Sequence, residues 1–566
     1  MLNRCLVVAA LGAAVVLGVA SASGCAAPTQ GNASQAGAGA GGAETDSSDG
    51  SATTATPLPL PPLQCTLAAA AAEPTWLRDA VGYQIWVRSF RDSDGDGHGD
   101  LDGIVAGLDA LRDNKPGGLD LDVDTLWLSP IFVSPSDHGY DATDYLHVQP
   151  QFGGDAALQR LLTAAKARGM RVLLDLVLNH TSREHPWFLD SKSGAGAEHR
   201  NWYVWRDVAP DAEHGWGQPW NAKAKVWHDG GTGAYYGLFW EGMPDLNLAW
   251  PPVADAMIGV AKYWLGQGAS GFRLDAVRYL VESGPGAGQA DTVQTHAFLR
   301  RLVQESRTVR GDVALIGEVW TDTATVRTYL EGDDPLSGAF DFDTTQGLRK
   351  GLELHSAALV RNALCKGASV PGGALQHFAG NHDMPRIAGF AGSDALRVVA
   401  LALPLLLPGT PWVYQGDELG LPDGDASGDR AYRTPLPWQA AAPAAGFSTG
   451  TPWQPLPASY PPLAVDAQDA DPKSVRSRVR ELVALRRSLA ALRQGPARIL
   501  AAEGDASHTA LMWVSGAKAE VLVVLAFDAA EVALPQEFAD ASLRFSTNAA
   551  RDGNTVQGPG VFVLER

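Results

Sequence analysis

Short apolar, β-rich runs alternate with amphipathic helical stretches from residue 79 onwards. Thr125–Leu128 reads as a strand, Asp155–Arg168 as a helix and Arg171–Val177 as the next strand. Such alternation predicts a parallel sheet covered by helices. The proposed strands are Val81–Phe90, Thr125–Leu128, Arg171–Val177, Gly271–Asp275, Ala314–Glu318, Gly338–Phe342, Gln376–Ala379 and Pro411–Tyr414. They are eight, the number that closes a (β/α)₈ TIM barrel, so we predict this α/β fold.

Two regions depart from the alternation. The connection over about residues 181–250 is far longer than ordinary strand–helix loops, which predicts an inserted subdomain after the third strand. It is rich in aromatic residues, and we expect most of these rings to form its own small core. Residues 495–566 change to short strands with Gly, Asp and Asn turns. They predict a C-terminal β-sandwich domain, which leaves residues 79–494 for the barrel and its insertion.

The first 24 residues have the pattern of an export signal. Arg4 precedes the apolar run Cys5–Ala20, which is short for a membrane span, and small residues follow it. Ala22-Ser23-Gly24-Cys25 resembles a bacterial lipoprotein box, so we expect Cys25 to carry lipid that anchors the chain to a membrane facing the periplasm or the exterior. The alternative is plain secretion of a soluble protein after cleavage at Ala22.

Residues 25–78 are rich in Gly, Ala, Ser, Thr and Pro, and this composition predicts a disordered tether. If Cys5 leaves with the signal and Cys25 carries lipid, Cys65 and Cys365 remain as the one pair in an oxidising compartment. We therefore predict a disulfide between them, with two unpaired thiols as the alternative.

The formal net charge of −19 argues against nucleic acid as a partner, because phosphate binding needs clustered Lys and Arg. The acidity fits solubility, and one acidic segment fits cation binding. Asp92, Asp94, Asp96 and Asp100 stand at alternate positions with glycines between them, as a calcium loop requires. An EF-hand is excluded because its last position is Gly103 and a strand precedes the loop.

Polar residues stand where four of the predicted strands end, and this is where barrels of this class place their active sites. A charged residue that closes an apolar strand is either buried at a cost or used by a site. Four strand ends together favour a site. These segments are Asp175–His180, Arg273–Asp275, Gly317–Glu318 and Asn381–Asp383.

Paired carboxylates are what glycoside hydrolysis needs, one ionised to attack the anomeric carbon and one protonated to assist the leaving oxygen. Arg273, two residues before Asp275, would hold that carboxylate ionised and oriented. Asp275 is thus the predicted nucleophile, and Glu318, in a less charged context, the predicted acid/base.

The four segments, in order, resemble the signature regions of glycoside hydrolase family 13, the α-amylase family. Met243-Pro-Asp-Leu-Asn247 resembles the fifth region of the group between oligo-1,6-glucosidases and neopullulanases. The resemblance implies Asp383 as the third, transition-state-stabilising carboxylate. It also implies that His180 and His382 bind the glucose beside the scissile bond, with Arg273 supporting the nucleophile.

Other segments refine what the resemblance implies. Tyr140 is similar to the tyrosine that stacks on the terminal glucose, Asp137 to the Asp that binds its outer hydroxyls in exo-acting members, and Arg433 to the arginine that pairs with that Asp. Ala276 is the small residue typical of α-1,4-acting relatives. Many members hold structural Ca²⁺ in a loop like that of residues 92–100, with the carbonyl at His98 among the ligands.

These observations favour a retaining hydrolase of α-1,4-linked glucans such as starch, maltodextrin or maltooligosaccharides, of the α-amylase type and monomeric. An α-glucosidase, a cyclomaltodextrinase or a glucosyl-transferring relative is the first alternative. An isomerase or phosphorylase that uses the same intermediate is another. A non-catalytic glucan-binding lipoprotein is a distant one, because such a protein is expected to lose a catalytic carboxylate.

Overall fold

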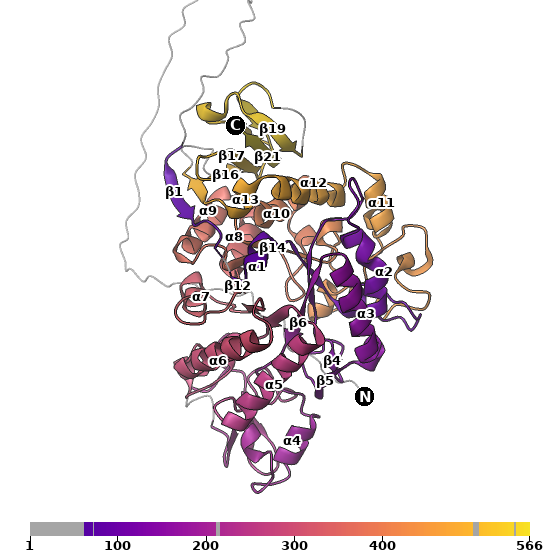
Figure 1. Cartoon of the computed structure of the whole chain (residues 1–566), viewed down its shortest axis with the longest axis vertical. Coiled ribbons are helices and arrows are strands. Elements are labelled where there is room, and N and C mark those ends of the chain that lie inside the picture. Colours follow the sequence, from indigo (N-terminus) through magenta and orange to yellow (C-terminus); the bar gives the residue numbers. More distant parts are fainter. Residues whose placement is uncertain (1–60, 72, 211–214, 502–508, 548–550) are drawn as a thin grey trace, which may run out of the picture. The chain divides into compact units, whose positions relative to one another are not determined.

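The computed structural model describes residues 61–71, 73–210, 215–501, 509–547 and 551–566. Eight parallel strands form a closed barrel in the order β2-β3-β6-β10-β11-β12-β13-β14. Figure 1 labels β6, β12 and β14 among them. They are β2 (Gly82–Ile85), β3 (Thr125–Leu128), β6 (Arg171–Leu176), β10 (Gly271–Leu274), β11 (Ala314–Gly317), β12 (Gly338–Phe340), β13 (Leu375–Phe378) and β14 (Thr410–Tyr414). Each lies within one of the eight predicted strands or overlaps it closely, so the predicted barrel is confirmed.

The first strand is shorter than its sequence suggests. β2 ends at Ile85, and Val87–Ser89 form a 3₁₀ turn. The amides beyond Ile85 bond to side chains instead of a neighbouring strand: Trp86 donates to Gln415 Oε1 at 2.9 Å and Val87 to Ser129 Oγ at 3.0 Å. The apolar run therefore continues past the strand because it lines the barrel mouth, where ladder bonds end.

Helix α2 buries one apolar stripe against the barrel, formed by Leu101, Ile104, Leu108 and Leu111. Helix α10 is buried almost all round, since every residue from Val398 to Leu406 is enclosed. The longer helices are α2 (Leu101–Leu111), α3 (Gly154–Ala167), α5 (Pro251–Gln267), α6 (Val293–Val309), α7 (Thr323–Leu330), α8 (Phe342–Glu353), α9 (Ala357–Lys366), α10 (Asp394–Leu406) and α12 (Val475–Ser488). The short ones are α1 (Thr75–Asp79), α4 (Pro186–Ser191), α11 (Val465–Ala470) and α13 (Ala490–Gln494). Among the described residues, no helix combines the length and the apolar character that crossing a membrane needs.

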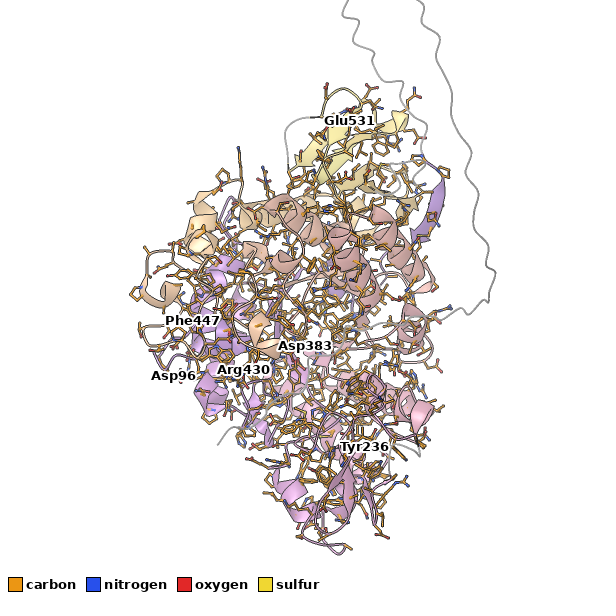
Figure 2. The ribbon with its side chains drawn as sticks, turned by 180° about the vertical axis from the view of Figure 1, so that it is seen from behind. Asp96, Tyr236, Asp383, Arg430, Phe447 and Glu531 are labelled. Atoms are coloured by element: carbon orange, nitrogen blue, oxygen red, sulfur yellow. A yellow bond between two sulfur atoms is a disulfide. The ribbon has the colours of Figure 1, made fainter. Side chains whose placement is uncertain are left out.

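The connection after β6 holds its own small sheet, in the order β7 (Trp205–Arg206), β9 (Ala234–Tyr236) and β8 (Trp227–Asp229). Trp216, Trp227 and Tyr236, the last labelled in Figure 2, pack into a separate apolar cluster beside this sheet. Other rings of the insertion join the main core instead: Tyr203 and Tyr235 are buried in it, and Trp202 and Trp205 pack against it. The insertion's own core therefore takes only part of its rings. A hairpin of β4 (Phe132–Val133) and β5 (Asp144–Val148) lies in the connection after β3.

The C-terminal region is all-β. Its six-stranded sheet has the order β1-β15-β16-β17-β21-β19, and β18 and β20 pair separately. Side chains alternate along each strand, so residues such as Met512 and Val524 face a cluster with the β18–β20 pair, while Trp513 and Val523 join the core shared with the barrel helices. The strands are β1 (Leu63–Leu67), β15 (Ala497–Leu500), β16 (Ala510–Ser515), β17 (Val521–Ala526), β18 (Glu531–Ala533), β19 (Ser542–Ser546), β20 (Thr555–Gln557) and β21 (Gly560–Glu565).

One prediction is wrong in part, because the tether assigned to residues 25–78 includes ordered structure. β1 pairs antiparallel with β15, Leu67 opposite Ala497, and so forms the edge of the C-terminal sheet. Cys65 on β1 forms the predicted disulfide with Cys365 on α9, with a Cα–Cα distance of 5.6 Å. The signal segment and Cys25 lie outside the described residues.

Candidate active site

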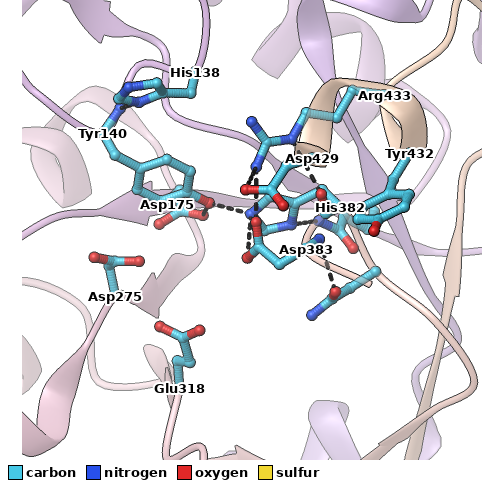
Figure 3. Close-up of polar contacts among 12 residues, drawn as sticks. His138, Tyr140, Asp175, Asp275, Glu318, His382, Asp383, Asp429, Tyr432 and Arg433 are labelled. Atoms are coloured by element: carbon cyan, nitrogen blue, oxygen red, sulfur yellow. Dashed lines mark hydrogen bonds and ion pairs between the residues drawn. The ribbon is translucent and has the colours of Figure 1, made fainter. Parts of the chain in front are cut away.

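The polar residues that end the strands converge at one end of the barrel. Figure 3 shows the carboxylates of Asp275, Glu318 and Asp383 facing a common space, although they follow three different strands, β10, β11 and β13. The parallel direction of the strands explains this convergence, because it brings all their carboxyl ends to the same rim. The predicted catalytic residues therefore lie together.

Arg273 is the centre of this arrangement. Its side chain is only 2% exposed, and its Nη1 lies 2.6 Å from Asp275 Oδ1 and 2.9 Å from Asp175 Oδ1. Nη2 lies 3.0 Å from Glu318 Oε2. A single buried guanidinium thus contacts three carboxylates, where the sequence predicted one.

Asp175 is a site residue that the sequence analysis did not assign. It lies opposite Arg273 in the register of β6 and β10, and it also accepts hydrogen bonds from Trp127 Nε1 and the Tyr140 hydroxyl, both at 3.1 Å. Asp175 begins one of the polar strand-end segments of the sequence, but its role depends on Arg273 in the neighbouring strand, and only the register of the two strands reveals that partner.

Burial raises the pKa of both predicted catalytic groups. Burial raises the pKa of Asp275 to about 6, against the opposing effect of the Arg273 charge. Burial also raises the pKa of Glu318 to about 7, and the nearby Asp275 carboxylate adds to the increase. Glu318 is the weaker acid of the pair, which suits a group that must deliver a proton while Asp275 stays ionised.

His382 lies between two rings beside these carboxylates. It stacks on Trp86 at 5.2 Å and on Tyr140 at 5.7 Å between ring centroids. Gln84 donates to its Nδ1 at 2.6 Å, so its Nε2 carries the proton, 2.6 Å from the Tyr140 hydroxyl. His180 donates from Nε2 to the Tyr140 carbonyl at 3.1 Å. The structure thus brings together Tyr140, His180 and His382, the residues predicted to bind the sugar.

Asp383 remains a strong acid although it is enclosed. Burial tends to raise its pKa, but neighbouring positive charge outweighs burial and holds the pKa below its usual value. The opposing electrostatic effect on the pKa comes first from His382, whose Nε2 lies 3.0 Å from Asp383 Oδ2, and then from Arg433 and Arg273. Arg433 Nη2 also donates to Asp383 Oδ1 at 2.8 Å.

The expected pairing of Arg433 with Asp137 does not occur. Asp137 Oδ2 instead accepts from Nε of Arg430, three residues earlier, at 2.7 Å. Arg433 lies against Asp383 and, at 3.6 Å, Asp429. Asp429, Arg430 and Arg433 all belong to the connection after β14. Figure 2 labels Arg430, and Figure 3 labels Asp429 and Arg433. Two arginines this close in sequence cannot be told apart without the path of the loop.

The acidic loop after β2 brings three carboxylates together. Oxygens of Asp92, Asp94 and Asp100 lie within 4.8 Å of one another, close enough to share one cation. Asp96 is outside this group and caps the backbone amide of His98 at 2.7 Å. Three hard oxygen donors on a glycine-rich curl suit Ca²⁺, so the side chains present fit that ion.

Most glycoside hydrolases use a pair of carboxyl groups, and Asp275 and Glu318 form such a pair around one buried arginine. The site thus has the residues of a glycoside hydrolase. The sequence model described as "Alpha amylase, catalytic domain" matches residues 84–495. The chain belongs to the α-amylase family, glycoside hydrolase family 13.

Relatives within the family differ in their stated activities. "Alpha-amylase 3" of Dictyoglomus thermophilum is 31% identical over 74% of this chain and 79% of its own length. An oligo-1,6-glucosidase of Parageobacillus thermoglucosidasius is 31% identical over 73% of this chain and 84% of its own. The structure of the trehalulose synthase MutB from Pseudomonas mesoacidophila superposes with a TM-score of 0.76 at 27% identity, covering 87% of this chain and 99% of that one. These relatives share the family of this chain, but family membership does not determine which glycosidic bond the enzyme cleaves or which product it forms.

The raised pKa values of Asp275 and Glu318 give a testable pH dependence of the activity. Asp275 must be ionised, so activity should fall as pH decreases through about 6, and Glu318 must be protonated, so activity should fall as pH rises through about 7. The plot of kcat/KM for maltotriose against pH should therefore be bell-shaped. On α-glucosyl fluoride, whose leaving group needs little protonation, Glu318→Gln should retain a larger share of the wild-type kcat/KM than on maltotriose. Equal losses on the two substrates would contradict the assigned role of Glu318.

Proposed function

We propose that the enzyme cleaves α-1,4-glucosidic bonds in starch, maltodextrin or maltooligosaccharides with retention, through a covalent glucosyl-enzyme. The observation that carries the proposal is the contact of one buried arginine with both Asp275 and Glu318. Asp275 attacks the anomeric carbon while Glu318 gives its proton to the leaving oxygen. Glu318 then takes a proton from water, which attacks the same carbon and releases Asp275.

The third carboxylate supports the sugar during this step. Asp383 is ionised and held by Arg433, so it accepts hydrogen bonds from sugar hydroxyls that strengthen as positive charge develops on the ring. Tyr140 stacks on His382, the residue next to Asp383 in the chain. The proposal of an α-1,4 bond rests on Ala276, the small residue after the nucleophile, and on the relative named an α-amylase.

An exo-acting α-glucosidase is a second candidate, and one contact favours it. The Asp137–Arg430 ion pair joins the connection after β3 to that after β14, on the side of the site occupied by Tyr140 and His382. A bridge there limits how far a chain extends past the bound glucose. Action from the non-reducing end would then release one glucose at a time.

The bond and direction of attack can be tested together. We expect the wild type to hydrolyse maltotriose and starch but not isomaltose, and both Asp275→Asn and Glu318→Gln to lose about three or more orders of magnitude in kcat. Glucose as the only early product would favour the exo-acting candidate, and mixed oligosaccharides the α-amylase. Preference for isomaltose would refute the α-1,4 proposal, and conversion of sucrose or maltose into an isomeric disaccharide would identify an isomerase.

We also propose that the loop of residues 92–100 binds Ca²⁺ through Asp92, Asp94 and Asp100. The loop packs on the segment after β14, where Ser448 Oγ donates to Asp92 at 2.6 Å and Trp453 donates to the Gly97 carbonyl at 2.9 Å. Bound Ca²⁺ would neutralise the carboxylates and hold this contact. Its role here is structural.

Removal of the ion should therefore destabilise the protein. Excess EDTA is expected to lower the melting temperature by several degrees, and added Ca²⁺ but not Na⁺ should restore it. Asp94→Asn should reduce the response to EDTA, while Asp109→Asn, a change of an exposed carboxylate outside the loop, should not. An unchanged transition in EDTA would count against the site.

We further propose that the enzyme is exported and anchored by lipid at Cys25. The support is the sequence pattern of residues 1–25 together with the disulfide between Cys65 and Cys365, which suits an oxidising compartment. Mass spectrometry of the mature N-terminus should find a diacylglyceryl group on Cys25 that Cys25→Ser removes. A mature chain that begins at Ser23 would instead show plain secretion.

A further inference from the structure

The ion pair between Asp137 and Arg430 joins the connection after β3 to the connection after β14, and we call this pair the bridge. The side chain of Arg430 is 59% exposed, so the pair by itself holds the two connections only weakly. Together with Arg88 and Gln151, the two residues line one cavity of about 480 Å³. Figure 2 labels Arg430 of the bridge and Asp96 of the acidic loop after β2. The position of the bridge therefore depends on what holds the backbone on either side of it.

Arg88 connects the Asp137 side of the bridge to the acidic loop. It stands in the 3₁₀ turn Val87–Ser89 and is only 6% exposed. Its Nε donates to the Asp137 carbonyl at 3.3 Å, and its Nη1 donates to His98 Nδ1 and to Gln151 Oε1, both at 2.7 Å. These three acceptors are neutral groups, so the buried charge depends on each of them. The guanidinium thus holds the backbone of Asp137 at a fixed place relative to His98.

His98 and Gln151 extend this contact into the acidic loop. His98 stands between Asp94 and Asp100, two of the three carboxylates that lie close enough to share one cation. Its amide donates to Asp96 Oδ1 at 2.7 Å, and Gln151 Nε2 donates to Asp96 Oδ2 at 3.4 Å. The curl of the loop therefore decides where the guanidinium finds its acceptors.

The same stretch of chain also holds the other side of the bridge. The Ser89 hydroxyl donates to the carbonyl of Arg433, three residues after Arg430, at 2.6 Å, and it accepts from Trp453 Nε1 at 2.9 Å. The Trp453 amide donates to the Gly97 carbonyl of the acidic loop at 2.9 Å. Both connections that form the bridge are thus attached to the turn after β2 and to the loop that follows it.

From these contacts we infer that Arg88 is a positioning residue that couples the acidic loop to the bridge, so that Ca²⁺ in the loop favours the closed end of the substrate site. His98 and Asp137 stand where one guanidinium spans them, and loss of the loop's curl would break that span. A maltooligosaccharide that contacts Asp137 then binds more tightly when the loop holds Ca²⁺. By linkage, the sugar tightens Ca²⁺ binding by the same factor. The inference rests on the proposed function and its Ca²⁺ site, and it adds a connection between the two.

Reciprocal binding measurements test this coupling without turnover. In the Asp275→Asn background, calorimetric titration of the metal-free protein with Ca²⁺ should give a Kd about fivefold lower in saturating maltotriose than without it. Titration with maltotriose should show the same factor between the Ca²⁺-loaded and the metal-free protein. Arg88→Met, which keeps a long side chain but removes its donors, should bring both factors close to one.

Further variants separate the coupling from a general loss of charge or fold. Arg91→Met is the matched control, because the Arg91 guanidinium lies over the Trp438 ring and donates to the Ala106 carbonyl at 3.3 Å, so it should keep the wild-type factor. Arg88→Lys retains the charge on a single ammonium that cannot span the acceptors, and it should lose the coupling. His98→Ala removes one acceptor and should reduce the factor from the other end. Thermal melting identifies any variant that has lost its fold.

The active enzyme offers a second readout. A bridge that has lost its anchor should admit longer chains, so Arg88→Met should raise the ratio of kcat/KM for maltoheptaose to that for maltotriose about fivefold. Removal of Ca²⁺ from the wild type should move this ratio in the same direction, and removal of Ca²⁺ from Arg88→Met should not move it further.

The outcomes separate the inference from the proposed function. A coupling factor of one in the Asp275→Asn protein, or a factor that Arg88→Met leaves unchanged, would overturn the inference while hydrolysis by the wild type stands. A protein that binds no Ca²⁺ would overturn the inference together with the proposed ion site. If the wild type hydrolyses no maltooligosaccharide, the proposed function itself fails, and the inference fails with it.

Discussion

The active site depends on the burial of one guanidinium among three carboxylates. Arg273 contacts Asp175, Asp275 and Glu318, and all four side chains are enclosed. One positive charge cannot balance three negative charges in a medium that solvates them poorly, so keeping all three ionised is costly. The group therefore retains a proton near neutral pH. Glu318, with the highest pKa of the three, is the residue on which that proton is held.

This charge cluster is a direct consequence of the barrel's register. Arg273 and Asp275 are two residues apart, so they point to the same side of β10, and β6 places Asp175 level with Arg273. Glu318 follows β11, the neighbour on the other side. The three adjacent parallel strands β6, β10 and β11 thus place these charged side chains at the same level along the barrel axis. A register shift of one residue between β6 and β10, or between β10 and β11, would point a carboxylate away from the barrel interior and toward the surrounding helices.

The sequence predicted the elements whose signal is local, and it missed contacts that depend on how distant loops lie. Strands such as Arg171–Leu176 and the residues at their ends could be found because apolar runs and polar termini are visible in the chain itself. Asp175 could not be assigned, because its partner is revealed only by the strand register. β1 was hidden for a similar reason: Leu63–Leu67 lies in a Pro-rich, Ala-rich stretch and becomes a strand by pairing with β15.

Asp137 pairs with Arg430 and not, as predicted, with Arg433. This difference shows why endo or exo action is harder to predict from the sequence than the type of bond cleavage. Arg433 is buried against Asp383, where removing either partner would leave an uncompensated charge, so this pair is a fixed part of the site. Arg430 is 59% exposed, and an ion pair of that kind contributes only about 0–1 kcal/mol. A polar ligand that reaches Asp137 can compete with a contact this weak. Whether the end of the site is closed to longer chains is thus decided by a small energy difference at the surface, whereas bond cleavage is set by the buried charges around Arg273.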